Sequence, residues 1–170
     1  MLGIWDLKVM CNKFKNILKG KVVIAGIGNA LRGDDAFGLR LIENISGKVN
    51  AACFNLGTAP ENYIGKIAKE EPNTILLVDA LDLGKNPGDF EILKSEEIVN
   101  SGFTTHDLSP RMFIDFLKAQ TKAQIYLLGV QPEKLNFSEE MSPKMNRALE
   151  KVTELIKEVL SCTKPILSRR

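Results

Sequence analysis

The segment KVVIAGI at residues 21–27 runs directly into the polar, glycine-rich turn GNALRGDD at residues 28–35. A short run of β-branched and other apolar residues is typical of a strand that is buried on both faces of a parallel sheet. TILLVD at residues 74–79 and AQIYLLGV at residues 123–130 have the same character. These three segments predict the interior strands of an α/β sheet.

Helical patterns lie between and after the predicted strands. Apolar residues recur every three or four positions over residues 37–45, 112–117 and 145–159, as expected for helices with one buried face. Ser109-Pro110 and Ser142-Pro143 each offer an N-cap hydroxyl followed by a proline at the first helical position. Two of the helices are therefore expected to begin there, the second being the long terminal helix.

Residues 50–55 and 88–93 are weaker strand candidates. The turn DLGKNPG at residues 82–88 leaves no room for a crossover helix, so the strand after it is expected to be antiparallel and at an edge. We predict a single three-layer α/β domain, with a mostly parallel, twisted sheet of about five strands, one antiparallel edge strand and helices on both faces.

The expected domain covers residues 21–160. Residues 1–20 form a basic extension that is long enough for an added helix, and residues 161–170 form a C-terminal tail. Apolar residues make up 44% of the chain and charged residues 26%, which favours a soluble folded domain over a disordered or fibrous one.

The composition excludes several classes of protein. Cys11, Cys53 and Cys162 are far apart and form no C-x-x-C pair, which disfavours a disulfide framework and a cysteine metal site and predicts a reducing, cytoplasmic location. The first twenty residues lack the apolar core of a signal peptide, and no stretch reaches membrane-spanning length, so we expect neither export nor membrane insertion. Basic residues gather at the two ends without a basic stripe or interleaved aromatics, so no nucleic-acid binding is predicted.

Ligands of open α/β sheets bind beyond the carboxyl ends of the strands, so the turn GIGNALRGDD at residues 26–35 is the first place for chemistry. It resembles a dinucleotide fingerprint until Leu31 replaces the third glycine, and a P-loop until Asp34 and Asp35 follow Gly33. Two carboxylates repel phosphate and attract cations, which disfavours a nucleotide-binding regulatory domain. Taken alone, the pair is explained by Asp34 capping the next helix and Asp35 complementing its dipole.

Two further polar residues follow strand-like runs. Asp79 ends the run ILLV and is either a turn residue bonded to backbone or a member of an ion site, whereas Asp82 lies nearer the turn and is expected to be structural. His106, the single histidine of the chain, lies in the loop TTHDLSP. Together with Asp35 and Asp79 it completes two carboxylates and one imidazole, a set that suits a borderline divalent transition metal with open positions.

A nucleophilic serine or cysteine is not indicated. Cys53 lies in an apolar segment and no G-x-S-x-G motif occurs, which disfavours covalent catalysis.

Five blocks carry a resemblance to a known family. They are GIGNALRGDD (26–35), GTAPEN (57–62), LLVDALDLGKNPG (76–88), TTHDLSP (104–110) and LLGVQPE (127–133). In this order they resemble the hydrogenase maturation endopeptidases, which remove a C-terminal extension from the large-subunit precursor of nickel-iron hydrogenases. The likeness is greatest to the type that serves formate-hydrogenlyase hydrogenases.

The resemblance implies a metal-dependent, aspartyl-type endopeptidase in which Asp35, Asp79 and His106 bind nickel. That nickel is supplied by the hydrogenase large-subunit precursor and is not permanently bound. Asp34, Glu61 and Gln131 then either contact the precursor or close turns, with Asp34 mainly a turn and helix-cap residue. A non-catalytic nickel-checkpoint or chaperone module that binds the same precursor is the alternative. The oligomeric state is not predicted.

One position departs from the family's G-D-[DE]-G-x-G pattern. Ala36 stands where the first of the later glycines belongs, while Gly38 is kept. Ala36 would be strained at a positive φ and favoured in a helical first turn.

Overall fold

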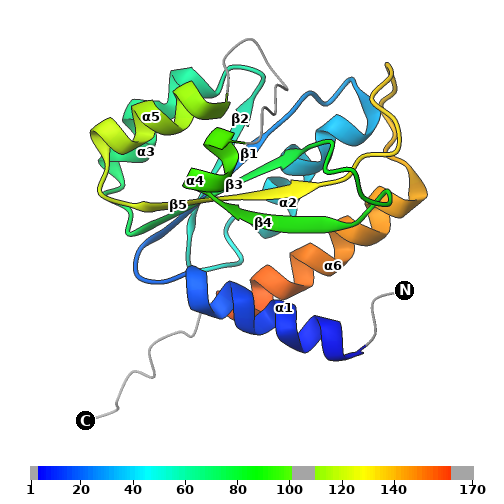
Figure 1. Cartoon of the computed structure of the whole chain (residues 1–170), viewed down its shortest axis with the longest axis horizontal. Coiled ribbons are helices and arrows are strands. Elements are labelled where there is room, and N and C mark those ends of the chain that lie inside the picture. The colour runs from blue at the N-terminus through cyan, green and yellow to red at the C-terminus, as the bar shows by residue number, and fades with distance from the viewer. Residues whose placement is uncertain (1–3, 101–109, 162–170) are drawn as a thin grey trace.

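The computed structural model describes residues 4–100 and 110–161 of the chain. Its centre is a five-stranded sheet in the order β2-β1-β3-β5-β4, in which β4 alone pairs antiparallel (Figure 1). The strands are β1 Val22–Ile27, β2 Ala52–Gly57, β3 Thr74–Ala80, β4 Phe90–Lys94 and β5 Gln124–Val130. The predicted fold class, including the antiparallel edge strand after the 82–88 turn, is confirmed.

Helices cover both faces of the sheet. In Figure 1, α3 and α5 lie above it, whereas α1 and α6 lie below it. Helix α2 packs against α6 and joins the same core. The helical segments are α1 Ile4–Ile17, η1 Gly33–Ala36, α2 Phe37–Ile45, η2 Pro60–Tyr63, α3 Ile64–Lys69, α4 Ser95–Asn100, α5 Pro110–Gln120 and α6 Pro143–Val159, with η denoting 3-10 helices.

Strand β3 shows why apolar runs form the interior of this sheet. All of its residues are buried. Ile75 and Leu77 join the core under α3 and α5, and Leu76 and Val78 join the core against α2 and α6. Successive side chains of a strand point to opposite faces, so a strand between two helical layers is apolar at most of its positions.

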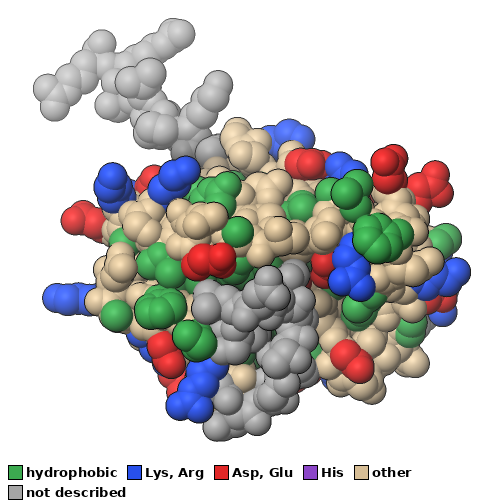
Figure 2. Space-filling model, turned by 90° about the horizontal axis from the view of Figure 1, so that it is seen from above, with side chains coloured by type: hydrophobic (Ala, Val, Ile, Leu, Met, Phe, Trp, Pro, Cys, Tyr) green, Lys and Arg blue, Asp and Glu red, His purple; other side chains and the backbone are tan. Residues whose placement is uncertain are grey.

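The N-terminal helix α1 packs on α6 and extends the lower core. Phe14 is fully buried there and Cys11 and Leu18 are nearly so, while Lys13 and Lys15 stay exposed. Seen from above, the upper face carries small groups of hydrophobic side chains among charged ones (Figure 2). Among the described residues, no helix combines the length and apolarity needed to cross a bilayer.

The parallel strands place their carboxyl ends at one edge of the sheet. There β1 leads into η1, β2 leads toward η2, and β3 ends at Ala80, one residue after Asp79. Helix α5 leads directly back into β5, so its first residue, Pro110, also lies at this edge. The order and direction of the strands therefore place Asp34 and Asp35, after β1, at the same edge of the sheet as Asp79, at the end of β3.

Candidate active site

The turn after β1 is tight because two glycines allow it. Gly33 has φ +55°, a conformation that a residue with a Cβ rarely adopts. A Cβ on Gly28 would overlap the carbonyl oxygen of Asp35, to which the Asn29 N–H donates a hydrogen bond of 3.2 Å. The backbone of Asp35 is thus folded back against the end of β1.

Gly38 brings the start of α2 against the sheet. A Cβ at this position would lie 2.5 Å from the carbonyl oxygen of Val78 and 2.6 Å from that of Ile27. The η1 segment packs on β3 in the same region. This close approach sets Asp35, three residues before Gly38, at the end of β3 where Asp79 lies.

Asp35 and Asp79 are both buried, with 8% and 3% of their surface exposed. Taking carboxylates out of water is costly unless charge or hydrogen bonds compensate it, and a cation does so well. Within residues 4–100 and 110–161, no three His, Cys, Asp or Glu side chains are grouped to hold a metal ion. His106, the third predicted ligand, lies outside the described residues, so the complete ligand set remains a prediction.

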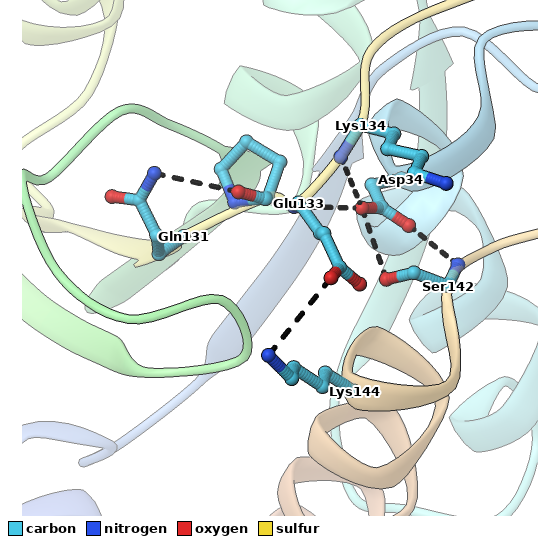
Figure 3. A network of polar contacts seen from close by, with 7 residues as sticks. Asp34, Gln131, Glu133, Lys134, Ser142 and Lys144 are labelled. Atoms are coloured by element: carbon cyan, nitrogen blue, oxygen red, sulfur yellow. Dashed lines mark hydrogen bonds and ion pairs between the residues drawn. The ribbon is translucent and has the colours of Figure 1, made fainter.

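Asp34 has a different role from its neighbour. It is fully buried, and its Oδ2 accepts hydrogen bonds from the backbone N–H groups of Glu133 and Lys134, both at 2.8 Å. Its Oδ1 accepts one from the Ser142 N–H at 2.7 Å, and the Ser142 hydroxyl donates to Oδ2 at 3.1 Å. Figure 3 shows the carboxylate enclosed between these groups. Asp34 therefore fastens the turn after β1 to the loop between β5 and α6.

This arrangement corrects two predictions about helix caps. Asp34 does not cap the following helix, because its carboxylate is directed at the β5–α6 loop, and neither η1 nor α2 begins with a side-chain cap. Ser142 does precede α6, but its hydroxyl bonds Asp34 instead of a backbone N–H of the helix. Both the N–H and the hydroxyl of Ser142 donate to the Asp34 carboxylate, a charged acceptor that forms strong hydrogen bonds. Ser109, the other predicted cap, lies outside the described residues.

Gln131 closes the turn between β3 and β4. Its Oε1 accepts hydrogen bonds from the N–H groups of Leu83 at 2.6 Å and Lys85 at 3.2 Å, and its Nε2 donates to Asp82 Oδ1 at 3.3 Å. Of the two roles left open for Gln131, the structure shows contacts for turn closure. Asp82 is structural, as predicted, since it also accepts from the Gly84 N–H at 3.1 Å. Glu61 is exposed in the first turn of η2, at the same edge of the sheet.

Comparison with known proteins decides the family. The HycI family model, described as hydrogenase maturation protease, matches residues 39–159. The chain belongs to the hydrogenase maturation protease family. This makes it a peptidase, a hydrolase of peptide bonds.

Several relatives of this protease are similar along most of their length. A putative hydrogenase maturation protease of Methanocaldococcus jannaschii is 31% identical over 165 residues, which cover 89% of this chain and 96% of the relative. The hydrogenase 3 maturation protease of Escherichia coli K12 is 35% identical over 133 residues, covering 76% and 85%. The crystal structure of a [NiFe] hydrogenase maturation protease HycI from Thermococcus kodakarensis KOD1 superposes with a TM-score of 0.80 at 35% identity, covering 87% and 98%.

Ala36 fits the turn of this protease without strain. It is buried, with φ −76° and ψ −6°, which is the helical region. Of the two alternatives predicted for Ala36, the structure has the helical one, in which alanine is favoured.

The described cysteines of the protease are poorly suited to nucleophilic attack. Partial burial in β2 raises the pKa of the Cys53 thiol to about 11, so almost none of it is thiolate near neutrality. Cys11 is buried under α6, where its thiol donates to Glu158 Oε1 at 3.5 Å. Both observations agree with the prediction against covalent catalysis.

Proposed function

We propose that this protease removes the C-terminal extension from the nickel-loaded large-subunit precursor of a nickel-iron hydrogenase. The observation that carries the proposal is the pair of buried carboxylates, Asp35 and Asp79, gathered at the carboxyl edge of the sheet in a member of this family. Buried acids at this edge suit a cation that arrives with the substrate. The relatives are named as hydrogenase maturation proteases, which supports the same substrate class.

In the proposed reaction, Asp35, Asp79 and His106 hold the nickel that the precursor already carries. Two carboxylates and an imidazole suit a borderline divalent ion, and they leave positions for ligands of the precursor. Nickel acts as a Lewis acid toward the scissile carbonyl or toward water. Hydrolysis adds the hydroxyl of water to the carbonyl carbon and a proton to the departing amine, so no covalent enzyme intermediate is needed.

The chain topology is compatible with His106 as the third ligand. Pro110 begins α5 at the edge where β3 ends, and His106 precedes Pro110 by four residues in the sequence. The protease then keeps no resident metal, and nickel serves as the signal that the precursor is complete.

Cleavage of a nickel-loaded precursor, followed by mass spectrometry, tests the proposal. We expect the wild-type protease to shorten the precursor at its C-terminus and to leave the metal-free precursor intact. Asp35→Asn, Asp79→Asn and His106→Ala should abolish cleavage, whereas the exposed Asp115→Asn on α5 should retain it.

The opposite outcomes separate the parts of the proposal. Full activity of Asp35→Asn would remove that residue from the site. A stable complex of the wild-type protease with a loaded precursor of unchanged mass would favour the non-catalytic checkpoint instead.

A further inference from the structure

Three large apolar side chains project into solvent beside the Asp34-Asp35 turn. Leu31 is 55% exposed, Leu135 is 42% exposed and Phe137 is 85% exposed. We refer to Leu31, Leu135 and Phe137 as the apolar platform. Scattered exposed apolar residues are ordinary, but large ones gathered beside a functional edge are typical of an interaction surface.

Backbone contacts join the two loops that form the platform. Arg32 and Ser138 make a parallel β-bridge, in which the Ser138 N–H donates to the Leu31 carbonyl at 3.0 Å and the Gly33 N–H donates to the Ser138 carbonyl at 2.7 Å. Residues that precede the partners of a parallel bridge are neighbours, so Leu31 adjoins Phe137. The Arg32 Nε donates to the Leu135 carbonyl at 3.2 Å and brings the third residue in. In Figure 1 these loops meet at one end of the sheet, after β1 and before α6.

Hydrogen bonds to Asp34, and not the apolar side chains of the platform, fix the loop that carries Leu135 and Phe137. Asp34, fully buried, bonds Glu133, Lys134 and Ser142, which lie on both sides of the platform residues in the β5–α6 loop. Leu135 and Phe137 remain exposed, so they add little to the stability of the fold. A fixed loop that presents unburied apolar groups is preorganised for a partner.

We propose that the apolar platform binds an apolar segment of the hydrogenase large-subunit precursor next to the scissile bond; this inference rests on the proposed function. The platform is continuous with the site, because Leu31 precedes Asp35 by four residues and the platform loop is bonded to Asp34. The exposed side chains of Arg32 and Lys134 give it a polar rim, as in protein interfaces with an apolar centre. A peptidase must hold a protein chain across its site, and this surface adjoins the turn that carries Asp35.

Kinetics of precursor cleavage test the platform. The variants are Phe137→Ser and the double variant Leu135→Ser/Phe137→Ser, and Val9→Ser, 64% exposed on α1, is the matched control. We expect the double variant to raise KM and the Kd for the loaded precursor by about tenfold or more, the usual effect of losing an apolar anchor, with kcat within about twofold. Phe137→Leu should keep most of the affinity that Phe137→Ser loses, and Val9→Ser should leave KM and Kd within about twofold of the wild type. Unchanged urea-unfolding midpoints would show that all variants are folded.

The outcomes distinguish this inference from the proposed function. If the wild-type protease cleaves the precursor and the double variant has KM and Kd values within about twofold of the wild type, the inference about the platform is wrong and the proposed function stands. A wild-type protease that binds but does not cleave the precursor overturns the peptidase proposal, while loss of binding in the double variant still supports the platform. A wild-type dimer that the double variant converts to a monomer, with an unchanged Kd for the precursor, assigns the surface to a second copy and overturns the inference.

Discussion

Replacement of Asp34 by alanine removes the acceptor of four hydrogen bonds that join the turn after β1 to the β5–α6 loop. A bond to a charged group contributes about 1.5–3 kcal/mol. The bonds from Glu133 and Lys134 are only partly buried, so we expect water to take the place of the carboxylate and to recover part of the loss. We expect the free energy of unfolding to fall by about 3–5 kcal/mol, or the melting temperature by roughly 6–20 °C for a chain of this size.

Asparagine at the same position gives a graded result. Its amide oxygen can occupy the Oδ2 position and keep the bonds from Glu133, Lys134 and the Ser142 hydroxyl. Its NH2 group then faces the Ser142 N–H. Both groups are donors, so the bond that Oδ1 of Asp34 accepted is lost. The expected loss of unfolding free energy is about 2 kcal/mol, because one bond is lost and one buried donor is left unpaired.

Urea unfolding followed by far-UV circular dichroism measures both losses. Asp82→Ala is the matched control, since this exposed carboxylate accepts two hydrogen bonds in a turn and should cost less than about 1 kcal/mol. A loss below about 1 kcal/mol for Asp34→Ala, or equal losses for alanine and asparagine, would refute the anchoring role of Asp34.

Three other predictions follow from particular contacts. Gly38→Ala should lower the free energy of unfolding by about 2–3 kcal/mol, because the new methyl group meets the Val78 carbonyl. Gly65→Ala in α3 should raise it by about 0.5–1 kcal/mol, because a methyl group there has no atom within 4 Å and alanine favours a helix. Urea unfolding measures both changes. Gln131→Ala should cost about 1–3 kcal/mol by leaving two turn N–H groups without their acceptor, yet retain precursor cleavage if the residue only closes the turn. Native Cys53 should resist iodoacetamide at pH 8, as read by peptide mass spectrometry, and its labelling should rise only as the pH approaches its pKa of about 11. Because folding raises the pKa of this thiol, the stability that its neutral form contributes is complete below the unfolded pKa and is lost as the pH rises toward 11.

Much of the fold could be predicted because its signals are local. Residues 22–27, 74–80 and 124–130 are apolar at nearly every position, which is what burial between two helical layers requires. Helices α3 and α4, of six residues each, were not predicted, since fewer than two turns show little periodicity.

The site was predictable only in part. The positions of Asp35, in the turn after β1, and Asp79, at the end of β3, could be predicted because both lie near strand ends that share one edge of the sheet. Their role as metal ligands stays a prediction. The anchoring role of Asp34 was not found, since its partners lie 99–108 residues away and capping rules consider only local contacts. The platform was missed because Leu135 and Phe137 stand in a polar loop, and nothing local distinguishes an exposed apolar side chain from a buried one. The three-residue metal site itself stays a prediction.

The anchoring of Asp34 has a consequence for biosynthesis. The turn that holds Asp35 is made early by the ribosome, but its bonds to Glu133, Lys134 and Ser142 can form only after those residues have left the exit tunnel. A nascent or truncated chain that ends before residue 133 therefore has the acidic pair without the loop that fixes it. In this protein, the turn that carries the acidic pair is fixed only once the β5–α6 loop has been synthesised and has folded against it.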